Sequence, residues 1–447
     1  MTGSRSSVLN VGVLSAETLN VTFLVPYEVN GEDLIVEGYQ EIKLLPSGKI
    51  LFKGKPYDRL EFEAKENNGL FEVEGVTIGV NFHWERQETQ RFQGNVGIIV
   101  ENKPLQGSGP KLTLINRIDI EEYLKSVISS EMSATSSEEL LKAHAVVSRS
   151  WLLAQIDGKN KEKNLRGWVD NDDEKIVWYD RDDHANFDVC ADDHCQRYQG
   201  ITRQTSPFVE QAVEATRGLV LADGSGAVCD ARFSKCCGGV FEEFESCWDP
   251  SPHAYLQPLR DDIEESFFPN LKDEGIARQW IEESPDAFCN TEDIEILRQI
   301  LNSYDQETPD FYRWEVNYSR EQLSELLLRR TGTDFGDILE MEALERGTSG
   351  RIVRLRIKGT KKEKIIGKEL EIRRSLSKSH LYSSAFIAQV MRRDDDEVPG
   401  LWRLRGAGWG HGVGMCQIGA AVMAHKGYSF EKIVRHYFPG AELTKLY

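Results

Sequence analysis

The chain has 447 residues, 40% of them hydrophobic and 28% charged, which is typical of a globular protein with one large domain or two to three ordinary ones. Its formal net charge of −19 argues against a nucleic-acid partner or an anionic membrane surface, because both attract clustered Lys and Arg. No apolar run approaches the roughly 18 residues of a transmembrane helix, so none is expected.

The N-terminal residues carry no recognisable export signal. Residues 1–14 lack a basic segment followed by an apolar core and a small-residue cleavage site. The sequence alone therefore leaves two readings open, a cytoplasmic protein or a chain whose leader has been removed.

Residues 1–115 are predicted to form a β-rich region. Short runs such as LNVTFLVPYEV and FQGNVGIIVENK alternate apolar with polar residues and are separated by Asn-Gly and Pro-Ser-Gly turns. This period of two is typical of antiparallel strands with one buried face.

The pattern then changes to a helical pair. In IEEYLKSVISSEM the apolar residues fall on one face, and a second helix is predicted near Thr135, which has capping-box spacing to Glu138. Glu131 is therefore expected at the end of the first helix or in the bend that follows it. A carboxylate held at such a junction can face a cleft.

The remaining chain mixes helices with strands, so the predicted fold class is α+β. We expect a core over residues 116–250, a mixed lobe or insertion over 251–395, and a glycine-rich loop with a C-terminal helix over 396–447 that completes the core. The basic run 358–368 is interpreted as a solvated hairpin turn.

Two histidines and two cysteines lie within a dozen residues, at His184, Cys190, His194 and Cys195. Imidazole and thiolate are the ligands of tetrahedral zinc, and four of them would close its coordination sphere, so the predicted metal is structural. The spacing is not that of a zinc finger. The alternative is a disulfide between Cys190 and Cys195.

Glycines crowd the segment GAGWGHGVGMCQIGAA, with Trp409 and His411 between them. Such density allows close approach of a ligand to the backbone, and a tryptophan beside exposed amides suits a sugar ring. The segment lacks the Gly-Lys-Ser/Thr of a phosphate-binding loop. In FSKCCGGVFEEFESCW, Ser234 lacks the Gly-x-Ser-x-Gly pattern that surrounds a nucleophilic serine. A disulfide from Cys236 or Cys237 to Cys247 or Cys289 is expected only in an exported protein.

These blocks occur together in an order that resembles the stage II sporulation protein D/LytB family. EYLKSVISSEM followed by LLKAHAVVSRSW is similar to that family's "EYL-x-V-x-x-EMP … LKAQAVAARTY" block. HCQRYQG, AVEATRGLVL, FSKCCGG and the block from GWGHGVGMCQIGAA to FPGAEL match later parts in the same order. The matching blocks run from about residue 114 to the end of the chain.

The resemblance implies a lytic transglycosylase that cuts peptide-stripped glycan strands of peptidoglycan, with Glu131 as the catalytic acid and base. It equally implies an alternative, because LytB-type relatives are wall-binding enhancers of a cell-wall amidase. It also implies zinc at the His/Cys motif. We place the substrate-binding residues along the glycan cleft, at Arg149, Ser234, Trp409, His411 and Gln417, with Arg232 as a further cation.

Two departures from the family pattern concern the site. Ser133 stands where the family has proline, and Cys416 replaces the commoner serine. Neither removes the reactive carboxyl of Glu131, whose pKa must be raised by partial burial for it to act as an acid. Because the expected substrate is the cell wall, the expected location is the cell envelope.

Overall fold

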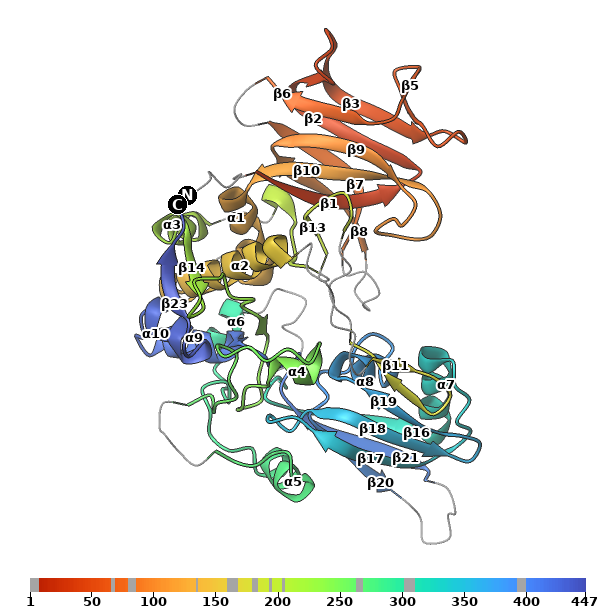
Figure 1. The fold of residues 1–447 in the computed structure, drawn as a ribbon, viewed down its shortest axis with the longest axis vertical. Coiled ribbons are helices and arrows are strands. Elements are labelled where there is room, and N and C mark those ends of the chain that lie inside the picture. Colours follow the sequence, from red (N-terminus) through yellow and green to blue (C-terminus); the bar gives the residue numbers. More distant parts are fainter. Residues whose placement is uncertain are drawn as a thin grey trace. The chain divides into compact units, whose positions relative to one another are not determined.

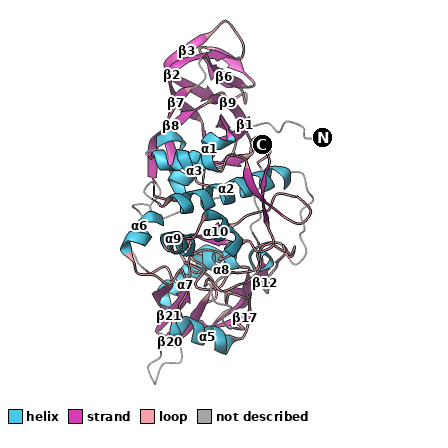
Figure 2. Ribbon diagram, turned by 90° about the vertical axis from the view of Figure 1, so that its left-hand side faces the viewer, coloured by secondary structure: helices cyan, strands magenta, loops and turns pink. Residues whose placement is uncertain are grey.

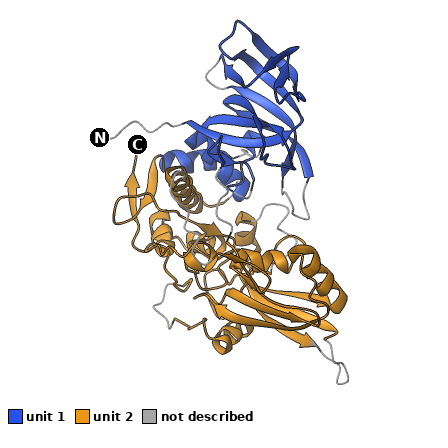
Figure 3. Ribbon diagram, turned by 45° about the vertical axis from the view of Figure 1, so that its right-hand side comes forward, with its two compact units in different colours: residues 1–135, 181–217 blue, residues 136–180, 218–447 orange. Residues whose placement is uncertain are grey.

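The computed structural model describes residues 8–65, 69–78, 86–133, 136–158, 168–178, 184–192, 195–202, 206–262, 268–300, 310–391 and 399–447. The chain clusters into two compact units: unit 1 comprises residues 1–135 and 181–217, and unit 2 comprises 136–180 and 218–447 (Figure 3). Together they contain sheets and helices, which confirms the predicted α+β class. No helix in the described ranges is long and apolar enough to cross a membrane.

Unit 1 is built on an eleven-stranded sheet in which the order β13-β1-β10-β9-β6-β2-β3-β4-β5 forms one path, while β7 pairs with β2 and β8 (Figure 1). All pairs are antiparallel except β1 with β13. The strands are β1 Val8–Ala16, β2 Thr18–Val29, β3 Ile35–Leu44, β4 Ile50–Phe52, β5 Lys55–Tyr57, β6 Leu60–Ala64, β7 Leu70–Ile78, β8 Arg86–Gln93, β9 Asn95–Glu101, β10 Lys111–Asp119 and β13 Val189–Cys190. The predicted β-rich start of the chain is confirmed.

Alternate residues of these strands face an aromatic core. In β2, Leu19, Val21 and Phe23 are buried, and the Phe23 ring packs against those of Tyr27 and Phe62 at centroid distances of 4.5 and 4.8 Å. The period-two pattern of the sequence therefore corresponds to one buried face. Unit 1 also contains helices α1 Ile120–Glu131 and α3 Pro207–Ala215, and the short 3₁₀ turn η1 Gly200–Thr202.

Unit 2 contains a five-stranded sheet, β11-β12-β19-β18-β17, and a three-stranded sheet, β16-β21-β20. Apolar side chains of both sheets and of helices α7 and α8 share one buried cluster, which includes Trp314, Phe386 and Trp402. The strands are β11 Val169–Asp170, β12 Glu174–Ile176, β16 Arg313–Ser319, β17 Ile338–Arg346, β18 Ile352–Gly359, β19 Glu363–Gly367, β20 Phe386–Met391 and β21 Leu401–Ala407. Residues 359–362 of the basic run form the turn of the β18–β19 hairpin, as predicted, with the Gly359 N–H donating to the Lys362 carbonyl at 2.8 Å. The rest of the run is not a solvated turn, because it continues into strand β19 and Lys368 donates to the carbonyls of Glu245 and Trp248.

The two ends of unit 2 meet in a helical layer. Helix α2 Glu138–Gly158 contacts α9 Gln417–His425 and α10 Phe430–Tyr437, and Figure 2 shows these helices gathered together in cyan. Strand β14 Leu219–Ala222 pairs with β23 Glu442–Lys445, and β15 Phe233–Ser234 pairs with β22 Met415–Cys416. The remaining helices are α4 Phe244–Cys247, α5 Glu274–Glu283, α6 Ile294–Ile300, α7 Arg320–Thr331 and α8 Glu369–Ser375.

Candidate functional site

Glu131 is the last residue of α1, at the junction where the sequence places it. The helix begins at Asp119, whose carboxylate accepts the Glu121 N–H at 2.8 Å, and it ends because Met132 adopts an extended backbone. The helix therefore stops at this point with Ser133 in place of the family's proline. Thr135, the predicted start of the next helix, lies outside the described residues.

The carboxylate of Glu131 is partly exposed and anchored on one side. Its Oε1 accepts the backbone N–H of Arg197 at 3.3 Å. Nearby, the N–H of Gln199 donates to the Ser126 hydroxyl of α1 at 3.2 Å, so the segment after Cys195 runs along this helix. The contact fixes one carboxylate oxygen while the residue keeps a face toward solvent.

A row of buried rings connects the sheet core to this helix. Phe92 lies 5.7 Å from Tyr198, and Tyr198 stacks on Tyr123 of α1 at 5.0 Å between centroids. The Tyr198 hydroxyl donates to Asn116 at 2.5 Å. Burial raises the pKa of the Tyr123 hydroxyl well above its ordinary value, and Cys195, Cys190 and, more weakly, Glu131 add to the rise. Tyr123 is therefore a neutral donor beside the thiols and the glutamate.

Three of the four predicted metal ligands converge in unit 1. The ligand atoms of His184, Cys190 and Cys195 lie within 4.8 Å of one another, close enough to hold a single metal ion. The Cys195 sulfur lies 3.6 Å from Nε2 of His184 and accepts the Cys190 N–H at 3.4 Å. Both cysteines are free thiols, so the alternative disulfide is not present. His194 lies outside the described residues.

Local structure explains how these ligands are positioned. Strand β13 places Cys190 opposite Gly12 of β1. The His184 ring stacks on Phe187 at 4.4 Å, and a side chain at Gly12 would meet that phenylalanine ring at 2.6 Å. Gly12 therefore permits the close approach of the segment that carries His184 and Phe187 to the sheet. The hydroxyl of Tyr123 finds no hydrogen-bond partner among the described residues, which leaves a donor available for a thiolate.

The five predicted substrate-binding residues belong to unit 2, whereas Glu131 and the metal ligands belong to unit 1. Ser234 and the glycine-rich loop lie together, because the Ser234 hydroxyl accepts the Gly412 N–H at 3.2 Å. At Gly410 a side chain would lie 2.9 Å from the Ser234 Cβ, so glycine permits this contact. The serine thus acts as a support for the loop.

His411 is held as a neutral imidazole. Its Nδ1 accepts the Val413 N–H at 3.0 Å, and its ring meets the edge of Trp248 at 4.9 Å. Burial lowers the pKa of His411 well below its ordinary value, and the positive charges of Arg232 and Arg351 lower it further. A neutral ring with one nitrogen already occupied can orient a ligand but cannot supply a positive charge.

Trp409 forms part of an aromatic group. It stacks on Phe311 at 4.7 Å and meets Tyr382 edge-on at the same distance, and it remains partly exposed. Its backbone pairs with Cys236, with N–H to carbonyl distances of 2.8 and 3.0 Å in the two directions. This rigid, half-exposed indole is the predicted residue best placed for stacking on a sugar.

Gln417 and Arg149 lie in the interior of unit 2. The Gln417 amide nitrogen lies 3.2 Å from Nε2 of His144, whose Nδ1 lies 3.1 Å from the Ser148 hydroxyl. Burial lowers the pKa of His144 to about 3, so this histidine is neutral. Arg149 is fully buried and donates to the Leu219 carbonyl at 3.0 Å. Both predicted residues therefore make internal contacts, and their role in substrate binding stays a prediction.

Sequence reasoning did not identify the buried arginine under the loop. Arg351 donates to the Gly410 carbonyl at 2.9 and 3.1 Å, to the Cys237 carbonyl at 3.1 Å and to Ser349 at 2.9 Å. A side chain at Gly412 would lie 2.5 Å from its guanidinium. A buried arginine in a strand-like stretch has no local sequence signal, because its partners come from distant segments.

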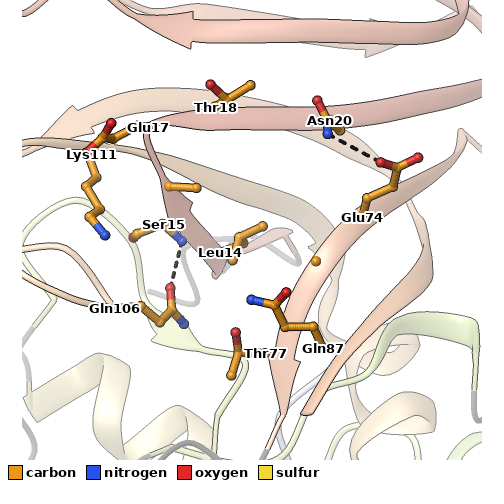
Figure 4. Close-up of a pocket in the computed structure, with 12 residues that line it drawn as sticks. Leu14, Ser15, Glu17, Thr18, Asn20, Glu74, Thr77, Gln87, Gln106 and Lys111 are labelled. Carbon is orange, nitrogen blue, oxygen red and sulfur yellow. Dashed lines mark hydrogen bonds between the residues drawn. The ribbon is translucent and has the colours of Figure 1, made fainter.

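A separate pocket of about 590 Å³ opens between strands of unit 1 (Figure 4). Figure 4 shows Gln106 bonded to the Ser15 backbone and Asn20 bonded to Glu74, at 2.8 and 3.3 Å. Its lining combines apolar, polar and charged residues, with Glu17 and Lys111 at its edge. None of the predicted site residues lines it.

Comparison with known proteins agrees with the order of the motifs. The family model described as "Stage II sporulation protein" matches residues 108–222, a range that includes Glu131 and the His/Cys loop. A domain of unknown function, DUF8618, matches residues 242–414.

Individual relatives extend the match. The stage II sporulation protein D of Bacillus subtilis is 22% identical over 74% of this chain and 76% of its own length, and that of Bacillus amyloliquefaciens gives the same identity over the same shares. An uncharacterized protein of Brachyspira hyodysenteriae is 25% identical over 74% of this chain and 68% of its own. Residues 108–222 therefore match the stage II sporulation protein family, and the alignments with stage II sporulation protein D extend over 74% of this chain.

Proposed function

We propose that the protein is a peptidoglycan lytic transglycosylase and that Glu131 is its single catalytic acid and base. The observation that carries this proposal is the position of Glu131. It ends α1 within the family-matched range, is partly exposed, and has one oxygen fixed by the Arg197 N–H. A reacting carboxyl needs this combination of a fixed position and an accessible face.

The proposed reaction needs only one carboxyl group. Protonated Glu131 donates its proton to the glycosidic oxygen as the bond from that oxygen to C1 of N-acetylmuramic acid breaks. The oxygen of the same sugar's 6-hydroxyl attacks C1, and the Glu131 carboxylate accepts the hydroxyl proton, which closes a 1,6-anhydro ring. Because the nucleophile belongs to the substrate, no activated water or second carboxylate is required, unlike in hydrolytic glycosidases.

The end of a helix supports the acid role of Glu131. The C-terminal end of α1 carries the partial negative charge of the helix dipole, which favours the uncharged carboxyl before the proton is transferred. The Arg197 N–H then stabilises the carboxylate that forms. These two influences suit a group that must alternate between both protonation states.

The metal that we propose for His184, Cys190 and Cys195 is zinc in a structural role. Zinc bound there would tie the segment that carries Arg197 to the strand β13. The protein's own residues would then hold the carboxylate of Glu131 in place. A closed set of four ligands, with His194 as the fourth, leaves no open position for a metal-bound water.

In unit 2 we propose that Trp409 stacks on a sugar ring, and that Ser234 and His411 shape the loop that carries it. Peptidoglycan lies outside the cytoplasm, so the proposed location is the cell envelope. The proposed partners are glycan strands and, in the alternative function, a cell-wall amidase.

The decisive experiment compares three proteins on peptide-stripped glycan strands with mass spectrometry of the products. We expect fragments ending in 1,6-anhydro-N-acetylmuramic acid from the wild type and none above background from Glu131→Gln. The matched control is Glu210→Gln, which removes an exposed carboxylate of unit 1 and should leave the products unchanged.

The alternative function predicts another outcome of the same experiment. If wild type and Glu131→Gln both bind the strands but neither cuts them, the transglycosylase proposal fails. Stimulation of an N-acetylmuramoyl-L-alanine amidase by both proteins to the same extent would then assign the enhancer role.

A further inference from the structure

A second group of sulfur and carboxylate ligands lies in unit 2, outside the predicted metal motif. The ligand atoms of Cys237, Asp261, Cys289 and Cys416 all lie within 4.8 Å of one another, and all four side chains are buried. They come from four separate segments. Cys237 follows β15, Asp261 precedes α5, Cys289 lies between α5 and α6, and Cys416 ends β22.

The distance between two of the sulfurs fits a shared ion. The sulfurs of Cys237 and Cys289 lie 3.5 Å apart and both cysteines are free thiols. A disulfide requires about 2.05 Å. Two thiolates bound to one tetrahedral zinc at about 2.3 Å would lie about 3.8 Å apart. The observed separation is therefore close to the second geometry and far from the first.

Backbone donors point at the sulfurs. Cys416 accepts the N–H of Cys237 at 3.3 Å and that of Gly419 at 3.4 Å, and Cys237 accepts the Gly239 N–H at 3.4 Å. Cys416 is also the N-cap of α9, where the helix dipole favours negative charge. Such donors stabilise thiolates in metal sites, and neutral buried thiols do not need them.

The buried carboxylate of Asp261 is oriented in the manner of a metal ligand. Its Oδ2 accepts the Cys289 N–H at 3.0 Å and its Oδ1 accepts the Tyr437 hydroxyl at 2.9 Å. Among the described residues its one ion-pair partner is His436, at 3.5 Å. Buried charges in proteins are paired or coordinate metals, and this one faces three thiols.

We infer that Cys237, Asp261, Cys289 and Cys416 bind one divalent zinc ion in a closed structural site of unit 2. The ligands are three thiolates and one carboxylate, which is a set that zinc accepts in tetrahedral geometry. One ligand, Cys416, belongs to the glycine-rich segment itself, and Cys237 follows Cys236, whose backbone pairs with Trp409 of that segment. Cys416 lies opposite Ser234 in the parallel pair of β15 with β22. The ion would fix the strand pair on which the loop rests.

Asp261 and Cys289 lie inside the range matched by DUF8618, residues 242–414, while Cys237 precedes it and Cys416 follows it. The ion would therefore join the segment of unknown function to the parts of unit 2 that flank it. This role is separate from that of the His184 motif, and it is independent of whether Glu131 cuts glycan.

The test uses the full chain, purified with reduced thiols and loaded with zinc or cobalt ions alone. Metal content by mass spectrometry should be two ions per chain for the wild type and one for Cys289→Ala. The variant should lose about three-fifths of the thiolate-to-cobalt charge-transfer absorption, because this site holds three of the five proposed thiolate ligands. Cys190→Ala should also retain one ion, and the double variant none. The matched control is Cys229→Ala, a buried thiol of unit 2 outside the group, which should retain two.

A second variant covers the case in which Cys289→Ala fails to fold. Asp261→Asn keeps the shape of the side chain and should lower the affinity of this site for zinc at least tenfold, with an unchanged circular dichroism spectrum. Two ions in Cys289→Ala, or unchanged affinity in Asp261→Asn, would overturn the inference. A disulfide between Cys237 and Cys289 would also overturn it, because the two sulfurs would then not be available to a metal. It would show as an intact mass of the wild type lower by two hydrogens than that of the reduced chain, and as a linked peptide pair in a digest.

Discussion

Replacement of Glu242 by glutamine tests how the interior of unit 2 is held together. The Glu242 carboxylate is fully buried. Its Oε1 accepts the N–H and the hydroxyl of Thr348 at 3.0 and 2.9 Å, and its Oε2 accepts the N–H and the hydroxyl of Ser349 at 3.2 and 2.5 Å. The Glu243 N–H and the Ser246 hydroxyl also donate to Oε1, at 2.9 and 3.0 Å.

Glutamine has the same shape, so the substitution leaves no cavity and changes only the hydrogen bonds. With its amide oxygen at the Oε1 position, its amide nitrogen faces the Ser349 N–H, which then has no acceptor. An unsatisfied buried donor costs about 1–3 kcal/mol. The Ser349 hydroxyl already accepts from Arg351 and loses a bond to a charged acceptor, worth about 1.5–3 kcal/mol. Relief from burying a charge offsets part of this loss, so we expect a net destabilisation of about 2–4 kcal/mol.

The assay is thermal unfolding followed by tryptophan fluorescence. For a unit of this size the loss corresponds to a fall in Tm of about 3–7 °C. Glu243→Gln is the matched control. Its carboxylate makes a surface ion pair with Lys272 at 3.4 Å, and its loss should change the free energy of unfolding by less than about 1 kcal/mol. If both variants unfold within 0.5 kcal/mol of each other, roughly the scatter of surface substitutions, the account of this buried network is wrong.

Three further predictions concern other parts of the chain. Because burial lowers the pKa of His144 to about 3, the unfolded chain binds a proton below pH 6.5 that the folded chain does not. The free energy of unfolding should therefore fall by about 1.4 kcal/mol for each pH unit below 6.5. Urea unfolding between pH 7 and pH 5 should show a smaller fall of this free energy for His144→Gln. Gly412→Ala should lower the free energy of unfolding by at least about 2 kcal/mol, because its φ is +76° and Arg351 blocks the new side chain. Gly427→Ala is the control, since its φ is +83° but its side chain would enter open space. It should lower the same free energy by only about 1 kcal/mol. Cys190→Ser should release metal from unit 1 and increase amide hydrogen exchange in the loop around it, and retention of the metal would contradict our assignment of its ligands.

Features carried by local sequence were predictable. The alternation within residues 18–29 identified a strand with one buried face, and the apolar spacing after Ile120 placed Glu131 at a helix end. The His184 motif was recognisable for the same reason, because its ligands lie within a dozen residues. Each of these signals depends on neighbours in the chain, and the structure keeps those neighbours together.

Features assembled from distant segments were not predictable. The sulfurs of Cys237 and Cys416 come together although the two residues are 179 positions apart. Nothing in the local sequence distinguishes them from the small buried residues that free cysteines usually are. The contact between the buried side chains of Gln417 and His144 could not be predicted either, because the two residues are 273 positions apart in the sequence. The limits of the predicted domains remain predictions.

The pairing of β14 with β23 bears on how the protein is made. Helix α2 and strand β14 leave the ribosome long before their partners α9, α10 and β23, which lie far downstream in the chain. At about 5–20 residues per second, the chain between the end of α2 and the end of α10 takes about 14–56 s to translate, and the apolar side of α2 lacks its cover for that time. The apolar side of α2 is therefore uncovered through most of the synthesis of unit 2, and the pair of β14 with β23 cannot form until residues 442–445 have been translated.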